Sequence, residues 1–209
     1  GKWLVFQAAI DAQLIRAAPR ALVYLYWGDV DKVGHVFGPT SSQWGEEVER
    51  VDAELARLVA SVPADTAVYV TADHGMVEVP FTERIDLAAE PLLLDGVRHV
   101  GGEPRSVQLY CAPGAADDVA ARWRDRLGAQ ATVILRDEAV LAGLFGAPEA
   151  VAERVLPRIG DVIVNCVGDV AVVDTVRMRA ELLGLLGLHG SVSDDETAIP
   201  LFRWPARTA

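Results

Sequence analysis

The chain has 209 residues and a mass of 22.4 kDa, and 51% of its residues are hydrophobic, which is enough for a sizeable buried core. Thirty acidic and nineteen basic residues give a formal net charge of −11 without a basic block, so a nucleic-acid partner is not expected. The longest apolar runs, such as residues 182–188, are much shorter than the ~20 residues that a membrane span needs. Cys111 and Cys166 lie far apart, which predicts free thiols and no disulfide scaffold. Composition therefore indicates a folded globular chain and assigns it no cellular compartment.

The beginning of the chain suggests a piece of a longer protein. The sequence starts at Gly1, without an initiator methionine, and residues 2–18 carry apolar and polar side chains on opposite sides of a predicted helix. This pattern is typical of an amphipathic helix and not of a signal peptide. We expect further sequence of the same protein to precede Gly1.

The next part of the chain is predicted to form a strand, a helix and a second strand. Residues 22–27 are apolar and aromatic and too few for a helix, so a buried strand is expected there. Apolar residues recur at helical spacing over 40–62, with a capping-box pattern at its start, and a second buried strand is expected over 66–71. This order predicts a right-handed βαβ unit with parallel strands, and hence an α/β fold.

Shorter elements follow residue 80. We predict a hairpin that turns at Gly101 and Gly102, with residues 101–105 providing the turn, and a small accessory lobe at about 97–157. The other elements expected in this half are a helix over 115–127 and strands over 131–136, 162–165 and 170–173. No linker divides the chain into independent domains.

Asp73 and His74 follow the predicted strand 66–71, at the sheet edge where α/β proteins gather their ligands. Both could bind one ion if the backbone turned out of the strand, and Gly75 permits such a turn. An oxygen and a nitrogen ligand suit zinc or a neighbouring transition metal. The alternative is a capping aspartate beside a histidine packed at the strand end.

A second candidate pair lies in the loop after the predicted strand 22–27. Asp31 and His35 are four residues apart, so one helical turn would direct both toward one point. By spacing alone, Asp29 is an alternative to Asp31. If both loops lie at one edge of a parallel sheet, two ions held ~3.5 to 4 Å apart become reasonable.

The remaining polar residues near these motifs are less informative. His189 stands alone on a Leu-rich segment, where a histidine usually has a structural role, and His99 is expected on the surface of the hairpin. Thr71, Ser191 and Ser193 are the hydroxyls nearest to the motifs, and none is expected to be a nucleophile.

Taken together in chain order, these motifs resemble the type I phosphodiesterase and nucleotide pyrophosphatase family of the alkaline phosphatase superfamily. The resemblance spans the whole chain. It rests on a D-x-x-G-H-x-x-G-P element from Asp31 to Pro39, on Val51-Asp52, on D-H-G-M from Asp73 to Met76, and on His189-Gly190-Ser191.

The resemblance implies two zinc ions, with manganese less expected. Asp31, His35 and His189 would hold one zinc, while Asp73 and His74 would hold the other. The family's Thr or Ser nucleophile and one more aspartate, both at the second zinc, would precede Gly1. The implied fold is an alkaline-phosphatase-like α/β/α sandwich with a mostly parallel central sheet. Residues 1–209 would be the C-terminal portion of one such catalytic domain, lacking its N-terminal part.

The function implied is metal-dependent hydrolysis of phosphodiester or nucleotide pyrophosphate bonds. The substrates would be small phosphate esters or nucleotides, and the preceding segment of the same protein would be the chain's partner. A phosphomutase or phosphomonoesterase of the same superfamily is the nearest alternative. Another is a non-catalytic domain that bound metal stabilises. We expect the 209-residue chain alone to be inactive or nearly so.

Overall fold

A computed structural model of the protein describes residues 13, 15–17 and 20–206. The chain divides into two compact units, of which the first combines residues 1–73 with 198–209 and the second is the continuous segment 74–197. Most of the helix predicted over residues 2–18 lies outside the described residues, although Gln13, Ile15 and Arg16 are helical. Over the described ranges, no helix has the length and hydropathy of a membrane span.

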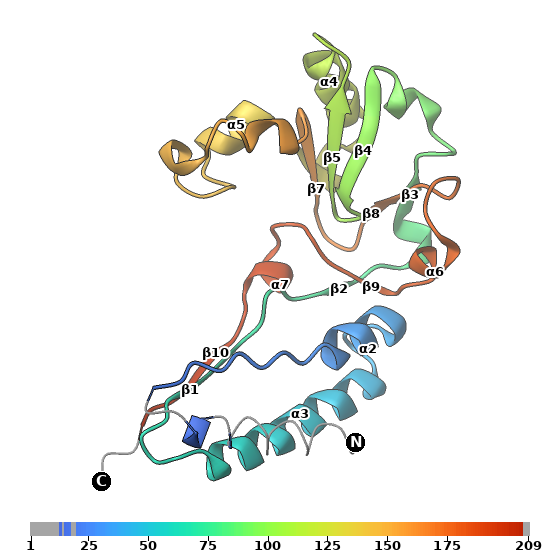
Figure 1. Cartoon of the computed structure of the whole chain (residues 1–209). Helices are drawn as coiled ribbons and strands as arrows, with labels where there is room; N and C mark the ends of the chain where they lie inside the picture. Colours follow the sequence, from blue (N-terminus) through green and yellow to red (C-terminus); the bar gives the residue numbers. More distant parts are fainter. Residues whose placement is uncertain (1–12, 14, 18–19, 207–209) are drawn as a thin grey trace. The chain divides into compact units, whose positions relative to one another are not determined.

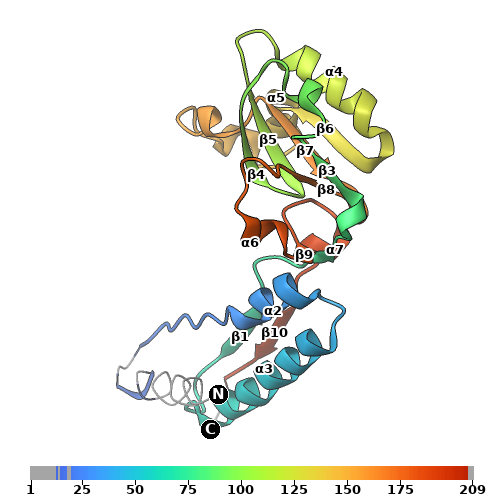
Figure 2. The same ribbon diagram turned by 90° about the vertical axis from the view of Figure 1, so that its right-hand side faces the viewer.

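Two helices dominate the described part of the first unit: α2 (Asp29–Phe37) and α3 (Ser42–Ser61), which pack against each other (Figure 2). The helix predicted over 40–62 is therefore confirmed. Its cap is not the predicted Thr40 box, because Ser41 has extended backbone and its Oγ accepts a hydrogen bond from the Trp44 N–H at 3.1 Å. The loop expected around residue 31 is instead the nine-residue helix α2.

The strand predicted over residues 22–27 is wrong. Residues 21–28 join no ladder in the described structure, and Leu22, Tyr24 and Tyr26 are exposed. The second predicted strand is present as β1 (Val68–Thr71), but its partner is β10 (Leu201–Trp204), which runs antiparallel to it (Figure 1). The predicted βαβ unit is thus not formed, because an apolar run specifies β-propensity without specifying its partner.

A four-stranded antiparallel sheet in the order β4-β5-β7-β6 forms the centre of the second unit. Its strands are β4 (Val97–Glu103), β5 (Ser106–Cys111), β6 (Ala131–Leu135) and β7 (Val162–Cys166) (Figure 1). All five residues of β7 are buried, because both faces of the sheet are covered. Val162 and Val164 belong to the large core beside α4 (Ala116–Leu127), whereas Ile163 packs with Ala139 of α5 (Arg136–Leu141).

The large core is organised around a fully buried tryptophan of α4. Trp123 packs among the apolar side chains of the sheet, and its Nε1–H donates to the Leu93 carbonyl at 2.8 Å. That hydrogen bond satisfies the one polar group that burial of the indole takes out of water. The helix predicted over 115–127 and the strands predicted over 131–136 and 162–165 are confirmed within a residue at each boundary.

The predicted hairpin is confirmed, but its turn consists of Pro104 and Arg105. Gly101 and Gly102 lie within β4. Gly102 has φ +83°, and a Cβ there would run into the Ser106 carbonyl oxygen, so this position requires glycine just before the turn.

Short elements complete the second unit. β3 (Arg84–Asp86) pairs in parallel with β8 (Ala171–Val173), the single parallel pair among the described strands. β2 (Val77–Glu78) pairs antiparallel with β9 (Gly187–Leu188). The remaining helices are α6 (Ala180–Leu183), α7 (Asp194–Thr197) and the 3-10 turns Phe81–Glu83, Pro91–Leu94, Gly128–Gln130, Pro148–Ala150 and Leu156–Arg158. The described chain combines helices and strands, which confirms the predicted α/β class in its broad form.

Candidate functional site

In the first unit, α2 brings Asp31 and His35 together. The two residues are one helical turn apart, and His35 Nε2 lies 3.3 Å from Asp31 Oδ1. Both side chains remain partly exposed, so a third group could reach them. Asp29 is on the same helix but not at this i,i+4 spacing, so the structure places Asp31 and not Asp29 against His35.

The glycines around this pair define where α2 lies and ends. Gly34 is the buried residue of α2, so the helix lacks a side chain at its most enclosed position. Gly38 ends the helix with φ +88°, and its N–H donates to the Gly34 carbonyl at 2.8 Å. Ser41 Oγ then donates to the Gly38 carbonyl at 2.7 Å and also caps α3. The spacing of the G-H-x-x-G-P element therefore has a local structural cause.

In the second unit, His74 and His189 lie face to face. Their ring centroids are 3.6 Å apart and the rings are 16° from parallel. The pairing of β2 with β9 brings the two segments together, because Val77 lies opposite Leu188, His189 directly follows β9, and His74 precedes β2 by three residues. His189 is half-buried and stacked on another candidate residue, so it is not the enclosed core histidine that the Leu-rich segment suggested.

Asp73 is exposed and lies at a bend two residues after the end of β1. The chain thus leaves the strand direction between Thr71 and His74, which is the departure that ligation by both Asp73 and His74 requires. His74 Nδ1 lies 2.8 Å from the Gly75 carbonyl oxygen, which directs the other ring nitrogen away from the backbone.

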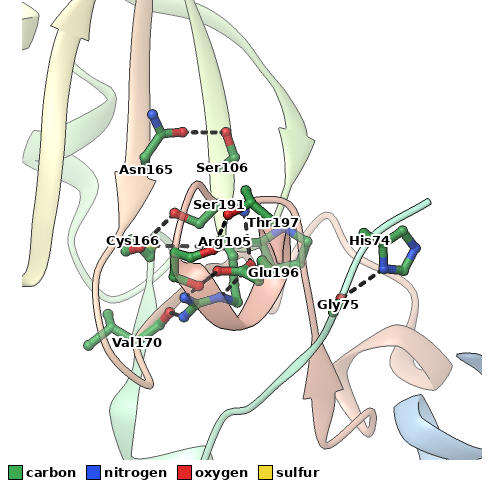
Figure 3. Close-up of polar contacts among 12 residues, drawn as sticks. His74, Gly75, Arg105, Ser106, Asn165, Cys166, Val170, Ser191, Glu196 and Thr197 are labelled. Atoms are coloured by element: carbon green, nitrogen blue, oxygen red, sulfur yellow. Dashed lines mark hydrogen bonds and ion pairs between the residues drawn. The ribbon is translucent and has the colours of Figure 1, made fainter. Parts of the chain in front are cut away.

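A buried polar cluster adjoins both histidine segments, and the sequence did not reveal it. Arg105 is fully buried and binds Glu196 through Nε and Nη2, each at 2.8 Å (Figure 3). Glu196 Oε1 accepts from the Ser191 N–H at 2.9 Å, and its backbone carbonyl accepts from the Gly75 N–H at 2.7 Å. The one sequence signal for Glu196 is the Ser193-x-x-Glu196 capping pattern, and Ser193 Oγ does donate to Glu196 Oε2 at 2.5 Å.

Comparison with known proteins shows which family the chain belongs to. The family model for type I phosphodiesterase / nucleotide pyrophosphatase matches residues 2–191. The chain belongs to this family.

One relative and several solved structures extend the match. Alkaline phosphatase PhoK of a Sphingomonas species is 25% identical over 241 residues, covering 96% of this chain and 42% of that protein. Murine ectonucleotide pyrophosphatase / phosphodiesterase 5, an inactive variant in complex with AMP, superposes with a TM-score of 0.69 at 19% identity and covers 97% of this chain and 52% of that one. Phosphonoacetate hydrolase from Sinorhizobium meliloti 1021, in complex with phosphonoformate, gives a TM-score of 0.66 at 20% identity, with coverages of 96% and 49%.

These structures confirm the predicted alkaline-phosphatase-like α/β fold. The mostly parallel central sheet expected with it is not what the described residues form, because their four-stranded sheet is antiparallel. The chain spans about half the length of the relatives that it matches.

The hydroxyl groups nearest to the motifs are engaged in hydrogen bonds to the protein. Ser191 is buried and its Oγ donates to the Cys166 carbonyl at 2.7 Å, while Ser193 Oγ donates to Glu196. Thr71 Oγ1 donates to the neighbouring Ala72 carbonyl at 3.3 Å. Each of the three hydroxyls therefore donates to a group of the protein itself.

Proposed function

We propose that this chain contributes the metal-binding residues of a phosphodiesterase or nucleotide pyrophosphatase. Asp31, His35 and His189 would hold one zinc ion, and Asp73 with His74 would hold a second. The observation that carries the proposal is the contact between candidate ligands within each unit: Asp31 with His35, which would share one ion, and His74 with His189, which would bind one ion each. Family membership supports it, because the match runs through all of these positions.

The donor set fits zinc. Imidazole nitrogens and carboxylate oxygens are ligands that zinc accepts, and half-exposed side chains leave room for a substrate oxygen. Two zinc ions, when bound, would activate a hydroxyl nucleophile and stabilise negative charge on the leaving oxygen. The histidines must be neutral and the aspartates ionised to bind, so affinity should rise from acidic to neutral pH.

The nucleophile would be a Thr or Ser that precedes this sequence, together with a further aspartate at the second zinc. Two observations support this assignment: the hydrogen-bonded state of the three nearby hydroxyls, and a chain length near half that of its relatives. Residues 1–209 would then be the C-terminal portion of one catalytic domain, with an accessory lobe at about 97–157. The chain alone would bind zinc and turn over little or no substrate.

The substrates would be small phosphate esters or nucleotides. The AMP complex of the murine phosphodiesterase supports a nucleotide, whereas the match to an alkaline phosphatase favours a phosphomonoester as the second candidate. Parallel assays with bis(p-nitrophenyl) phosphate and p-nitrophenyl phosphate, using the chain together with its preceding segment, separate the two.

Zinc binding by the chain itself tests the site without turnover. His74→Ala and His189→Ala should each weaken binding at least tenfold, because direct ligands matter more than the outer-shell groups whose loss costs about 10- to 100-fold. His99→Ala is the matched control, since His99 is exposed on β4 and packs against the Tyr110 ring with the two ring planes tilted by 44°. Unchanged zinc affinity in both ligand variants would overturn the assignment.

A further inference from the structure

We propose that Glu196, held in place by Arg105, is the positioning residue for His74 and His189. The inference rests on the proposed function, because the two histidines matter as zinc ligands only if that function holds. Glu196 itself would touch neither metal nor substrate. It would act on the segments that carry the two histidines, one through its side chain and the other through its backbone.

The His189 segment is held by the side chain of Glu196. Glu196 Oε1 accepts from the Ser191 N–H at 2.9 Å, two residues after His189. Ser191 Oγ donates to the Cys166 carbonyl at 2.7 Å, so the same residue is also tied to the end of β7. Gly190, between the two, has φ +123° and lies so close to Glu103 that a Cβ would be 2.6 Å from its Cβ. The backbone directly after His189 is therefore fixed by three contacts, with Glu196, with Cys166 and with Glu103.

The His74 segment is held by the backbone of α7. The Gly75 N–H donates to the Glu196 carbonyl at 2.7 Å, and a Cβ on Gly75 would collide with the carbonyl oxygen of Asp195. Only glycine permits this close approach. Whatever fixes Glu196 therefore also fixes the residue next to His74. Figure 3 draws His74 and Gly75 on the segment that passes beside the cluster.

Arg105 fixes Glu196. It reaches the carboxylate with two nitrogens at 2.8 Å each and uses Nη1 to bind the Val170 carbonyl at 2.6 Å. Burial alone would raise the pKa of Glu196, but hydrogen bonds from Arg105, Ser193 and Ser191 outweigh it and lower the pKa. The carboxylate is consequently ionised at neutral pH and accepts all of these bonds at once.

The position of this pair agrees with a role in organising the two histidines. A buried ion pair often adds little net stability compared with apolar residues of similar volume, and in some proteins its benefit is a defined geometry. Here the geometry concerns two backbone segments whose histidine rings lie 3.6 Å apart. A shift of either segment would change the direction of a ring nitrogen, which is the property that a tetrahedral metal site depends on.

The test compares Glu196→Ala and Glu196→Gln with Val133→Ala in the full chain. Val133 is a buried core residue of β6 and has no bond to the histidine segments, so its variant reports a loss of stability alone. Zinc affinity is measured by competition with a chromophoric chelator. We expect Glu196→Ala to weaken zinc binding about tenfold, the lower end of outer-shell effects, and Glu196→Gln to weaken it less because an acceptor for Ser191 remains. Val133→Ala should stay within twofold of the unmodified chain.

Amide hydrogen exchange on the metal-free chain supplies a second readout. In Glu196→Ala, exchange at the Ser191 and Gly75 amides should accelerate about tenfold or more. The Val79 amide, which donates to the Leu186 carbonyl at 2.9 Å beside the same strands, should keep its protection. If Glu196→Ala does not fold, Glu196→Gln decides the question by the same two measurements.

The outcomes separate the two proposals. If zinc affinity falls in His74→Ala and His189→Ala but stays within twofold in the Glu196 variants, the positioning role is wrong and the zinc site stands. If zinc affinity is unchanged in the histidine variants as well, the proposed function fails. Unchanged exchange at Ser191 and Gly75 would overturn the positioning role whatever the metal result.

Discussion

Substituting Arg105 by methionine should destabilise the second unit severely. The guanidinium is fully buried and makes three hydrogen bonds at 2.6 to 2.8 Å, two of them to the Glu196 carboxylate. Methionine fills a similar volume but donates no hydrogen bond. The buried carboxylate of Glu196 would then keep only the hydrogen bonds from Ser191 and Ser193. Removing one partner of a buried ion pair typically costs about 3–5 kcal/mol of unfolding free energy.

That loss should be visible as a drop of roughly 6–20 °C in Tm, from about 2–4 °C per kcal/mol for a chain of this size. Arg126→Met provides the matched control. Arg126 binds Glu90 through two contacts at 2.5 Å, in the same two-pronged manner, but both partners are partly exposed. An exposed pair contributes about 0–1 kcal/mol, so this variant should lose little. Urea unfolding at pH 7, followed by circular dichroism, gives both values.

The penalty of Arg105→Met should also depend on pH. In the unmodified chain the pKa of Glu196 is lowered, so its stabilising contribution is present above the ordinary glutamate pKa and is lost as pH falls through the lower, folded value. Without Arg105, fewer hydrogen bonds oppose the effect of burial, so the pKa of Glu196 rises and its carboxyl is protonated more readily. The difference between the two chains should therefore be largest at pH 7 and shrink below about pH 5. A loss under ~1 kcal/mol at pH 7, or a penalty that stays constant down to pH 4, would refute this reasoning.

Three further outcomes follow from buried or strained positions. Trp123→Phe removes an indole N–H that satisfies a buried carbonyl, and should lower the unfolding free energy by about 2 kcal/mol in urea; an unchanged midpoint would contradict the described contact. Cys166 is buried, and burial raises the pKa of its thiol to about 11. Iodoacetamide at pH 8 should therefore alkylate Cys111 first, as peptide mapping over time would show. The reverse order would count against the structure. Gly190→Ala places a side chain on a residue with φ +123° and should lower the unfolding free energy by about 1–3 kcal/mol. Gly184→Ala, where φ is −83°, should lower it by less than about 1 kcal/mol. Equal urea midpoints would show that the strain is absent.

Much of the second unit could be predicted because its signals are local. The apolar spacing of α4 and the β-branched run of β7 each specify an element without reference to distant sequence. Residues 22–27 gave an equally strong local signal, yet they join no ladder in the described structure. β-propensity shows that a segment could pair, while pairing itself depends on which strand lies beside it.

In the candidate site, too, local contacts could be predicted and contacts between distant segments could not. The four-residue spacing of Asp31 and His35 predicted their contact, because one helical turn is a local geometry. The contact of His74 with His189 depends on two strands of two residues each, which are too short to carry a pattern. Arg105 was hidden for a different reason: it occupies a hairpin turn, where arginine is usually solvated, and its buried partner lies 91 residues away.

The insertion of the second unit within the first has a consequence for folding order. Thr71 pairs with Leu201, so forming β1 with β10 from an unfolded chain closes a loop of roughly 130 residues at an entropic cost of about 4 kcal/mol. Once the second unit has folded, the bond from Gly75 to the Glu196 carbonyl holds its two ends side by side. The loop that remains is then only a few residues on each side. The folded second unit would thus lower the entropic cost of pairing β1 with β10. We therefore expect the second unit to fold before these two strands pair.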